Sequence, residues 1–111
     1  NMVFVTEHKA AYITISQDEL DACNYQKGDT EGFVNYGLSV AGIEMAVLMT
    51  ESQKDKMIKM SFRSKGDLAV NLFAKTYFEG GGHINAAGGK SNKSLQETEA
   101  YFLKSLATFL S

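Results

Sequence analysis

The segment 43–50 constrains the fold more than any other part of the chain. Its sequence, Ile-Glu-Met-Ala-Val-Leu-Met-Thr, is nearly all apolar apart from Glu44. A strand with apolar side chains on both sides is typical of the interior of a sheet that is covered on both faces. The rest of the chain must therefore supply neighbouring strands and the helices that cover them.

Alternating segments on either side supply further strands. Residues 10–16 place Ile13 and Ile15 on one side, and the earlier run 3–5 is positioned to pair with them across residues 7–9. Residues 56–63 also alternate, with Ile58, Met60 and Phe62 on one face and Lys59, Ser61 and Arg63 on the other. We expect this strand and 43–50 to form a hairpin that turns at residues 52–55.

Helix signals separate and follow these strands. Two capping boxes predict helix starts, Ser16 with Glu19 and Ser94 with Glu97. Two further starts are expected, one at Asp29–Glu31 and one at Asn71, which would cap a helix that ends at Phe78. The closing helix is expected to face the core through Leu95, Phe102, Leu103, Leu106, Phe109 and Leu110.

This order of elements predicts one domain over residues 1–111, with an α/β (α+β) fold and a mixed central β-sheet flanked by helices. Of the 111 residues, 44% are apolar and 22% are charged, which is too apolar for disorder and too interrupted for a membrane span. The net charge of −2 does not indicate a long nucleic-acid footprint, so phosphate binding must be local. The single cysteine, Cys23, excludes an internal disulfide and is best explained as a small buried hydrophobe. With no signal-peptide pattern, these features predict a cytoplasmic protein without a membrane partner.

Residues 80–89 concentrate five of the ten glycines and are the most informative stretch for function. Glycine costs about 0.5–1 kcal/mol relative to alanine in regular structure, so the cluster needs a backbone reason such as a positive φ or a close approach. Three glycines that lead into a short helix would direct N–H groups at an anion. The structural alternative is a helix C-cap at Gly80 followed by a flexible loop. His83 directly after the glycines favours the anion site, because an imidazole can donate to phosphate or stack on a base.

A second phosphate-compatible element, Ser61–Gly66, lies at the expected end of a strand and contains the only arginine, Arg63. A guanidinium offers a rigid fork of donors for two phosphate oxygens, and Ser64, Lys65 and the Gly66 backbone would add donors beside it. An isolated basic residue is usually a solvated surface charge. Two such elements in one small domain favour a joint site.

A third segment, Asp29–Asn35, lies at an expected helix entrance. Its acidic residues are explained by helix capping alone, while Asn35 could still touch a ligand. The chain has no Asp-His-His run and no histidine pair at metal-ligand spacing, so two dispersed histidines do not build a two-metal hydrolytic centre. We therefore expect no catalytic residue and no metal site in this chain by itself.

Together these residues resemble a known family, the C-terminal DHH-associated domain of the DHH phosphoesterases. Four stretches carry the resemblance: Phe62–Gly66, Val70-Asn71, Phe73-Ala74 and Gly80–Gly88. The nearest branch looks like the bacterial oligoribonucleases that also act as 3′-phosphoadenosine 5′-phosphate phosphatases, a group often labelled exopolyphosphatase-related. The resemblance spans nearly the whole chain, since Asp29–Asn35 is also similar to a family segment.

The resemblance implies a two-domain enzyme whose N-terminal DHH domain, absent from this chain, binds two manganese ions and cleaves phosphoester bonds. This chain would be the substrate-binding domain, with no cofactor of its own, for short RNA or a phosphorylated nucleotide. The full-length protein would be a possible homodimer. The residues implied in substrate binding are Arg63, Ser64, Lys65, Gly80, Gly81, Gly82, His83 and Asn85. Of these, His83 would lie nearest the scissile group and assist at the metal centre.

Other functions stay open at this point. One is a stand-alone nucleotide- or nucleic-acid-binding module without catalysis. Another is a dimerisation domain, which would leave the glycine cluster unexplained. Similar domains occur in enzymes that act on cyclic dinucleotides, polyphosphate or single-stranded DNA and in tRNA-synthetase editing regions. The slightly acidic charge balance argues against long DNA.

Overall fold

The computed structural model describes residues 2–23 and 27–110, without the side chains of residues 23 and 27–31. The predictions for the Cys23 thiol and for capping by Asp29–Glu31 lie outside the described side chains. A short 3₁₀ turn spans Thr6–His8. The strands and helices, in chain order, are β1 (Met2–Val5), β2 (Ala10–Ile15), α1 (Gln17–Cys23), α2 (Lys27–Ser39), β3 (Met45–Ser52), β4 (Met57–Ser64), α3 (Val70–Tyr77), β5 (Gly81–His83), β6 (Ala86–Ser91) and α4 (Leu95–Phe109).

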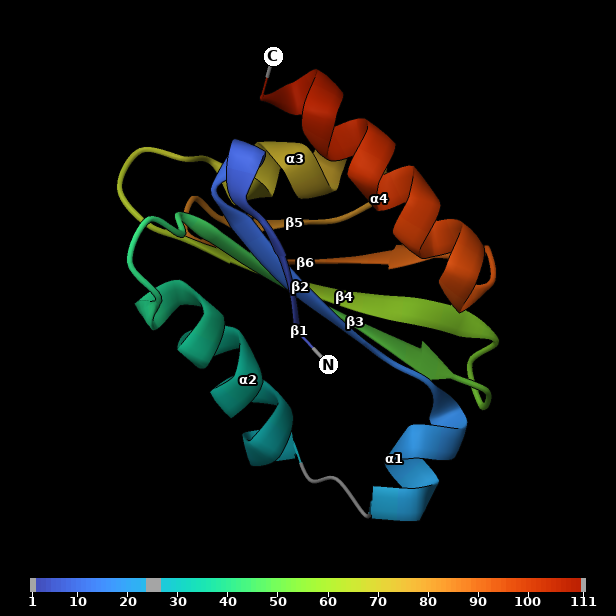
Figure 1. Ribbon diagram of the computed structural model, residues 1–111. Coiled ribbons are helices and arrows are strands. Elements are labelled where there is room, and N and C mark those ends of the chain that lie inside the picture. Colours follow the sequence, from blue (N-terminus) through green and yellow to red (C-terminus); the bar gives the residue numbers. More distant parts are fainter. Residues whose placement is uncertain (1, 24–26, 111) are drawn as a thin grey trace.

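The six strands form one mixed sheet in the order β1-β2-β3-β4-β6-β5. β2 and β3 are parallel and are joined through α1 and α2, whereas the other neighbouring strands are antiparallel. Figure 1 shows α3 and α4 on one side of the sheet and α1 and α2 on the other. The predicted α/β fold with a mixed sheet between helices is confirmed.

The central strand β3 takes part in two separate cores. Its residues Met45, Val47 and Met49 belong to the larger core under α3 and α4, while Ala46 and Leu48 belong to a smaller core with Val34 of α2. Coverage of both faces, which the apolar segment 43–50 predicts, is therefore confirmed. The strand itself begins two residues later than expected, at Met45.

The larger core contains an aromatic cluster that fixes the orientation of β4. Phe62 is fully buried, and its ring centroid lies 5.7 Å from those of Phe73 and Phe78. Complete burial of a phenylalanine contributes about 1.5–3 kcal/mol. Because successive side chains of a strand point to opposite faces, burial of Phe62 turns Arg63 toward the other face of the sheet.

Both capping boxes are present. The Ser16 hydroxyl accepts from the Glu19 N–H while the Glu19 carboxylate accepts from the Ser16 N–H, and Ser94 and Glu97 repeat the arrangement at α4. The helix face of α4 differs from the prediction at Leu103, which is 37% exposed. Leu103 follows the buried Phe102 directly, and one residue turns the helix by about 100°, away from the core.

The prediction that Asn71 caps α3 is wrong. The helix begins at Val70, and its N-cap is Ala69, which makes no side-chain cap. The Val70 N–H instead donates to the carbonyl of Ile84, 2.9 Å away, so that contact with the β5–β6 turn satisfies the end of the helix. The helix α2 also begins earlier than predicted, at Lys27 rather than at Asp29.

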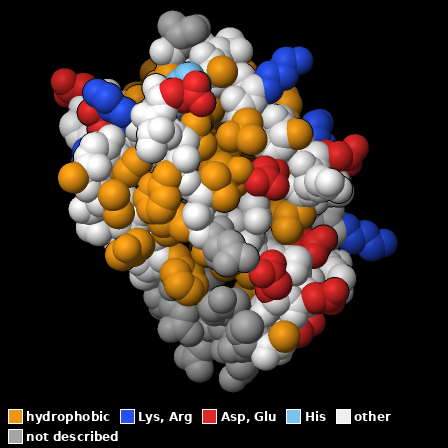
Figure 2. All heavy atoms as spheres, viewed as in Figure 1, with side chains coloured by type: hydrophobic (Ala, Val, Ile, Leu, Met, Phe, Trp, Pro, Cys, Tyr) orange, Lys and Arg blue, Asp and Glu red, His pale blue; other side chains and the backbone are white. Residues whose placement is uncertain are grey.

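The outer strand β1 carries an apolar surface. Figure 2 shows hydrophobic side chains gathered over β1 and α2, and the large exposed ones in these two elements are Val3, Phe4 and Tyr36. The described side chains of β1 and α2 include no lysine or arginine that could contact a phosphate. No helix in the described part of the chain is long and apolar enough to cross a membrane.

Candidate functional site

The glycine run 80–89 forms a β-hairpin, so the predicted loop that leads into a short helix is wrong. In the ladder between β5 and β6, Gly81 lies opposite Gly88, Gly82 opposite Ala87 and His83 opposite Ala86. The structural alternative of a C-cap at Gly80 is also wrong, because α3 ends with its C-cap at Phe78. The paired backbone groups of β5 and β6 therefore serve the sheet, while the Gly80 N–H donates to the Ala74 carbonyl of α3 at 3.1 Å.

Close approaches explain three of these glycines. A Cβ atom on Gly80 would overlap the carbonyl oxygen of Gly88, and one on Gly82 would lie 2.8 Å from the carbonyl oxygen of Ala86. Gly82 also has a φ of +143°, which side chains disfavour. A Cβ atom on Gly89 would lie 2.9 Å from the Cβ of Phe78. The expectation that a close approach or a positive φ underlies the cluster is confirmed at these three positions.

Packing does not explain the other two glycines of the run. A Cβ atom on Gly81 would meet nothing within 4 Å, and one on Gly88 would have only an ordinary contact of 3.6 Å with the Met60 carbonyl oxygen. Both residues are exposed and lie directly opposite each other in the ladder. A bare backbone at these positions leaves room for a molecule outside the fold.

Gly81 and Gly88 belong to a sheet surface that we call the open face. It consists of the residues of β4, β6 and β5 that point away from the larger core: Lys59, Ser61, Arg63, Ala86, Gly88, Lys90, Gly81 and His83. Arg63 lies opposite Ala86, which lies opposite His83, so these three form one row across the strands. With strands about 4.8 Å apart, the backbones of Arg63 and His83 are about 10 Å apart.

The ionisable residues of the open face are all basic. The three strands contain no aspartate or glutamate, and all four of their basic residues lie on this face: Lys59, Arg63, His83 and Lys90. Helix α2 packs on the same side of the sheet over β2 and β3 and also contacts β4, so it borders the face. A local positive surface thus exists in a chain whose net charge is −2.

Arg63 is held in place by the backbone. Its Nη1 atom donates to the carbonyl of Phe62 at 3.0 Å, and the side chain is half-buried. No carboxylate among the described residues forms an ion pair with this guanidinium. Its other N–H groups can therefore donate to an anion on the open face, beside the exposed His83.

Ser64 and Asn85 lie next to the open face but act within the fold. The Ser64 hydroxyl is buried, donates to the carbonyl of Leu68 at 2.6 Å and accepts from the Asn85 Nδ2 at 2.9 Å. The same Nδ2 donates to the carbonyl of Gly66 at 3.1 Å. These bonds tie the end of β4 to the β5–β6 turn, so the two side chains position the hairpin.

Lys65 is not part of the open face, because β4 ends at Ser64. Its backbone N–H donates to the carbonyl of Glu44 at 2.9 Å, and its side chain is exposed. Together with Glu44, Asp67 and Leu68 it lines a hollow of about 520 Å³. Two carboxylates in this hollow make it a poor place for a phosphate.

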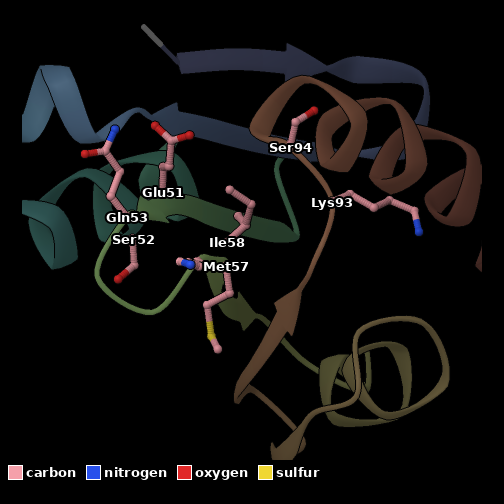
Figure 3. A pocket seen from close by; sticks show the side chains of 8 residues that line it. Glu51, Ser52, Gln53, Met57, Ile58, Lys93 and Ser94 are labelled. Atoms are coloured by element: carbon pink, nitrogen blue, oxygen red, sulfur yellow. The ribbon is translucent and has the colours of Figure 1, made fainter.

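A hollow of about 220 Å³ lies at the other end of the sheet, between the β3–β4 turn and the start of α4 (Figure 3). The Glu51 carboxylate accepts from the Gln17 N–H at 2.9 Å. Figure 3 shows the Lys93 side chain directed away from the other labelled residues, and its ammonium lies 5.1 Å from the Tyr101 ring centroid. The polar groups therefore do not converge on a ligand there.

Metal binding finds no support in the described residues. They include no group of three or more histidine, cysteine, aspartate or glutamate side chains that could hold a metal ion. The residues of the open face are donors of hydrogen bonds and positive charge, which suits an anion and not a divalent cation. Manganese therefore does not fit this part of the chain.

The sequence-based site is thus divided by the structure. The fold brings Arg63, Gly81 and His83 together on the open face, and it places the side chains of Ser64 and Asn85 behind that face. Lys59, Ser61, Gly88 and Lys90 were not among the predicted site residues. The alternation of 56–63 shows Lys59 and Ser61 on the same side as Arg63, but only the register of β6 reveals that Gly88 and Lys90 join them.

Comparison with known proteins gives both a family and a fold. The model of the DHHA1 domain family matches residues 7–111. An exopolyphosphatase-related protein from Bacteroides fragilis is 35% identical with a TM-score of 0.90, and the match covers 98% of this chain and 32% of that one. The chain thus spans about a third of that relative. No curated protein matches the chain.

Two more distant structures share the fold alone. The pGpG-specific phosphodiesterase PggH from Vibrio cholerae has a TM-score of 0.61 at 10% identity, with 91% of this chain and 34% of that chain covered. The C-Ala domain of alanyl-tRNA synthetase from Aquifex aeolicus has a TM-score of 0.59 at 10% identity, with 86% of each chain covered. The same sheet and helices therefore occur in proteins with different names and lengths.

Proposed function

The chain belongs to the DHHA1 domain family, and from that premise we propose that it is the substrate-binding domain of a longer DHH-type phosphoesterase. Its substrate would be a short oligoribonucleotide or 3′-phosphoadenosine 5′-phosphate. The observation that carries the proposal is the open face, where every basic side chain of β4, β5 and β6 surrounds two glycines that packing does not require. Phosphate is the anion that this arrangement suits best.

The open face would bind a phosphate group between Arg63 and His83. Arg63 is already oriented by its bond to the Phe62 carbonyl, so little side-chain freedom is lost when its free N–H groups meet phosphate oxygens. His83 lies two strands away, on β5. Its imidazole would donate an N–H to the phosphate or stack on a base of the ligand. Gly81 would let the ligand approach the backbone between them.

Cleavage of the phosphoester would require the N-terminal DHH domain and its manganese ions. When bound there, manganese supplies Lewis-acid activation of the scissile phosphate and of a water nucleophile. The role of this chain is to hold the substrate in a fixed position against that domain, with His83 nearest the scissile group. The cytosol is our proposed location, since one cysteine in 111 residues suits a reducing compartment.

An affinity measurement on an Arg63→Ala variant tests the proposal. The chain would be titrated with 3′-phosphoadenosine 5′-phosphate and with a 5′-phosphorylated diadenylate, without metal, and followed by amide-resolved NMR. Loss of a charge-assisted hydrogen bond should weaken binding of both ligands by about 1.5–3 kcal/mol. Shifts of the wild-type amides should concentrate at Arg63, Gly81 and His83.

Lys75→Ala is the matched control, because Lys75 is exposed on α3, on the opposite side of the sheet, and carries the same charge. This control should bind as the wild type does. Equal affinities of the Arg63→Ala variant and the wild type would contradict the proposed function.

A further inference from the structure

We propose that Lys59 and Lys90 form a second phosphate contact on the open face, so that the domain prefers three linked nucleotides to a single nucleoside bisphosphate. This inference rests on the proposed function, because it assumes that a first phosphate binds between Arg63 and His83. It concerns the other end of the same face and names the ligand length that this face selects.

The two lysines lie side by side. Lys59 of β4 is directly opposite Lys90 of β6 in the antiparallel ladder, and both side chains are exposed on the open face. Like charges that are directly opposite destabilise a sheet. The Lys59 ammonium has an ion pair with Asp55 at 2.8 Å, whereas Lys90 has no ion pair with any described residue. An anion over this pair would relieve the repulsion.

The spacing along β4 sets the length of the ligand. Lys59 precedes Arg63 by four residues, which corresponds to about 13–14 Å along a strand. Neighbouring phosphates of a nucleic acid are separated by six covalent bonds, and since three bonds span about 3.8 Å, the phosphates lie at most about 7 Å apart. Two such steps match the distance between the lysine pair and Arg63. A nucleoside 3′,5′-bisphosphate makes only one step, but a 5′-phosphorylated trinucleotide makes both.

The row of the open face between the two ends is made of small residues. The intermediate row of the face consists of Ser61, Gly88 and Gly81, which contribute one small hydroxyl and two bare backbones. The middle phosphate can lie against this row. The two glycines that packing leaves unexplained thus occupy the position that a continuous phosphate chain would cross.

The test compares two ligands, 3′-phosphoadenosine 5′-phosphate with two phosphates and 5′-phosphorylated triadenylate with three. Both would be titrated into the wild type, Lys90→Ala and Arg63→Ala at several salt concentrations without metal. We expect Lys90→Ala to weaken triadenylate binding about tenfold and to leave the bisphosphate affinity unchanged. The slope of log K against log salt for triadenylate should fall by about 0.7, the change for one lost single-strand phosphate contact.

Two controls make the outcome specific. Lys104→Ala removes an exposed lysine on α4, across the sheet, and should change neither affinity nor slope. Lys90→Ala should keep or raise the free energy of unfolding, since it removes the repulsion with Lys59. A fall in stability would instead show that Lys90 serves the fold.

Failure of this inference and failure of the proposed function would give different results. If Arg63→Ala weakens both ligands while Lys90→Ala behaves like Lys104→Ala, only the second contact is refuted. The same holds if the wild type binds triadenylate no better than the bisphosphate. If Arg63→Ala changes neither ligand, or if the wild type binds neither, the proposed function falls with it.

Discussion

Replacing Gly80 by alanine should destabilise the domain strongly, whereas the same change at Gly81, one residue later, should not. A Cβ atom on Gly80 would overlap the Gly88 carbonyl oxygen and lie 2.7 Å from the Gly89 Cα. Both obstacles are backbone atoms of β6, which is held between β4 and β5. The overlap can therefore be relieved only by moving a strand.

These contacts set the expected loss in the free energy of unfolding. Inserting a carbon into a packed interior costs about 1–3 kcal/mol and sometimes more, and a clash with backbone belongs at the upper end, so we expect about 3 kcal/mol for Gly80→Ala. At Gly81 a Cβ meets nothing within 4 Å and φ is not positive. Gly81→Ala should therefore stabilise the domain by about 0.4–1 kcal/mol, through the lower entropy of the unfolded chain.

Urea unfolding of the 111-residue chain, followed by far-ultraviolet circular dichroism, measures the free energy of unfolding of both variants. The two values should differ by about 3.5–4 kcal/mol. In thermal unfolding, Gly80→Ala should lower Tm by roughly 10–20 °C. Gly81→Ala should weaken phosphate binding although its stability is intact. A Gly80→Ala variant within 0.5 kcal/mol of the wild type, within the range of an ordinary surface change, would refute the packing explanation of this glycine.

Three further predictions concern the scaffold around the face. Burial, and then the hydrogen bond to the Glu99 carboxylate, raise the pKa of Tyr12 from 10.0 to about 12. The stability that Tyr12 contributes is therefore complete below pH 10.0 and is lost as the pH rises through about 12. Urea unfolding over this range should show a decline for the wild type that Tyr12→Phe lacks. The Ser94 backbone N–H, and then its hydroxyl, lower the pKa of Glu97 from 4.5, so this contribution is present above pH 4.5 and is lost in more acidic solution. Glu97→Gln should flatten the acid limb of the stability profile, and Ser94→Ala should lower the free energy of unfolding by about 1 kcal/mol. Ser64→Ala removes the hydroxyl that joins Asn85 to Leu68 and should cost about 1–3 kcal/mol in urea unfolding, while Ser64→Thr tests whether the hydroxyl alone suffices.

The parts of the fold that the sequence predicts are those fixed by local pattern. Alternation in 56–63 and the apolar run at 43–50 identify two central strands, because burial of one or both faces leaves a period in the sequence. The boxes at Ser16 and Ser94 identify two helix starts, because each joins residues only three apart. The hairpin of β5 and β6 leaves no such signal, since glycine-rich strands have no apolar alternation.

The parts of the site that sequence analysis misses are those that depend on register. Arg63 and His83 stand out by residue type and by neighbouring glycines. Lys90 becomes notable only because β6 pairs with β4 so that it faces Lys59, some thirty residues away along the chain. The Ser64 hydroxyl, in contrast, could have been placed from the sequence, because Ser64 lies two residues after Phe62 and therefore on the core side of β4.

The open face also explains why this chain would bind its ligand weakly by itself. The aromatic core behind β4 and β6, including Phe62 and Phe78, packs against the back of the face, so little binding energy should be lost in ordering its backbone. A sheet surface, however, covers a ligand from one side, whereas nucleotide-sized sites usually enclose roughly 70–90% of it. The missing enclosure must come from another surface, and the chain spans only 32% of its Bacteroides relative. In the longer phosphoesterase that we propose, the same ligands should therefore bind much more tightly, and Arg63→Ala should weaken their binding at least as much as in this chain. If the longer protein bound these ligands no more tightly than this chain does, the open face would be a complete site, and the expectation of a second enclosing surface would be wrong.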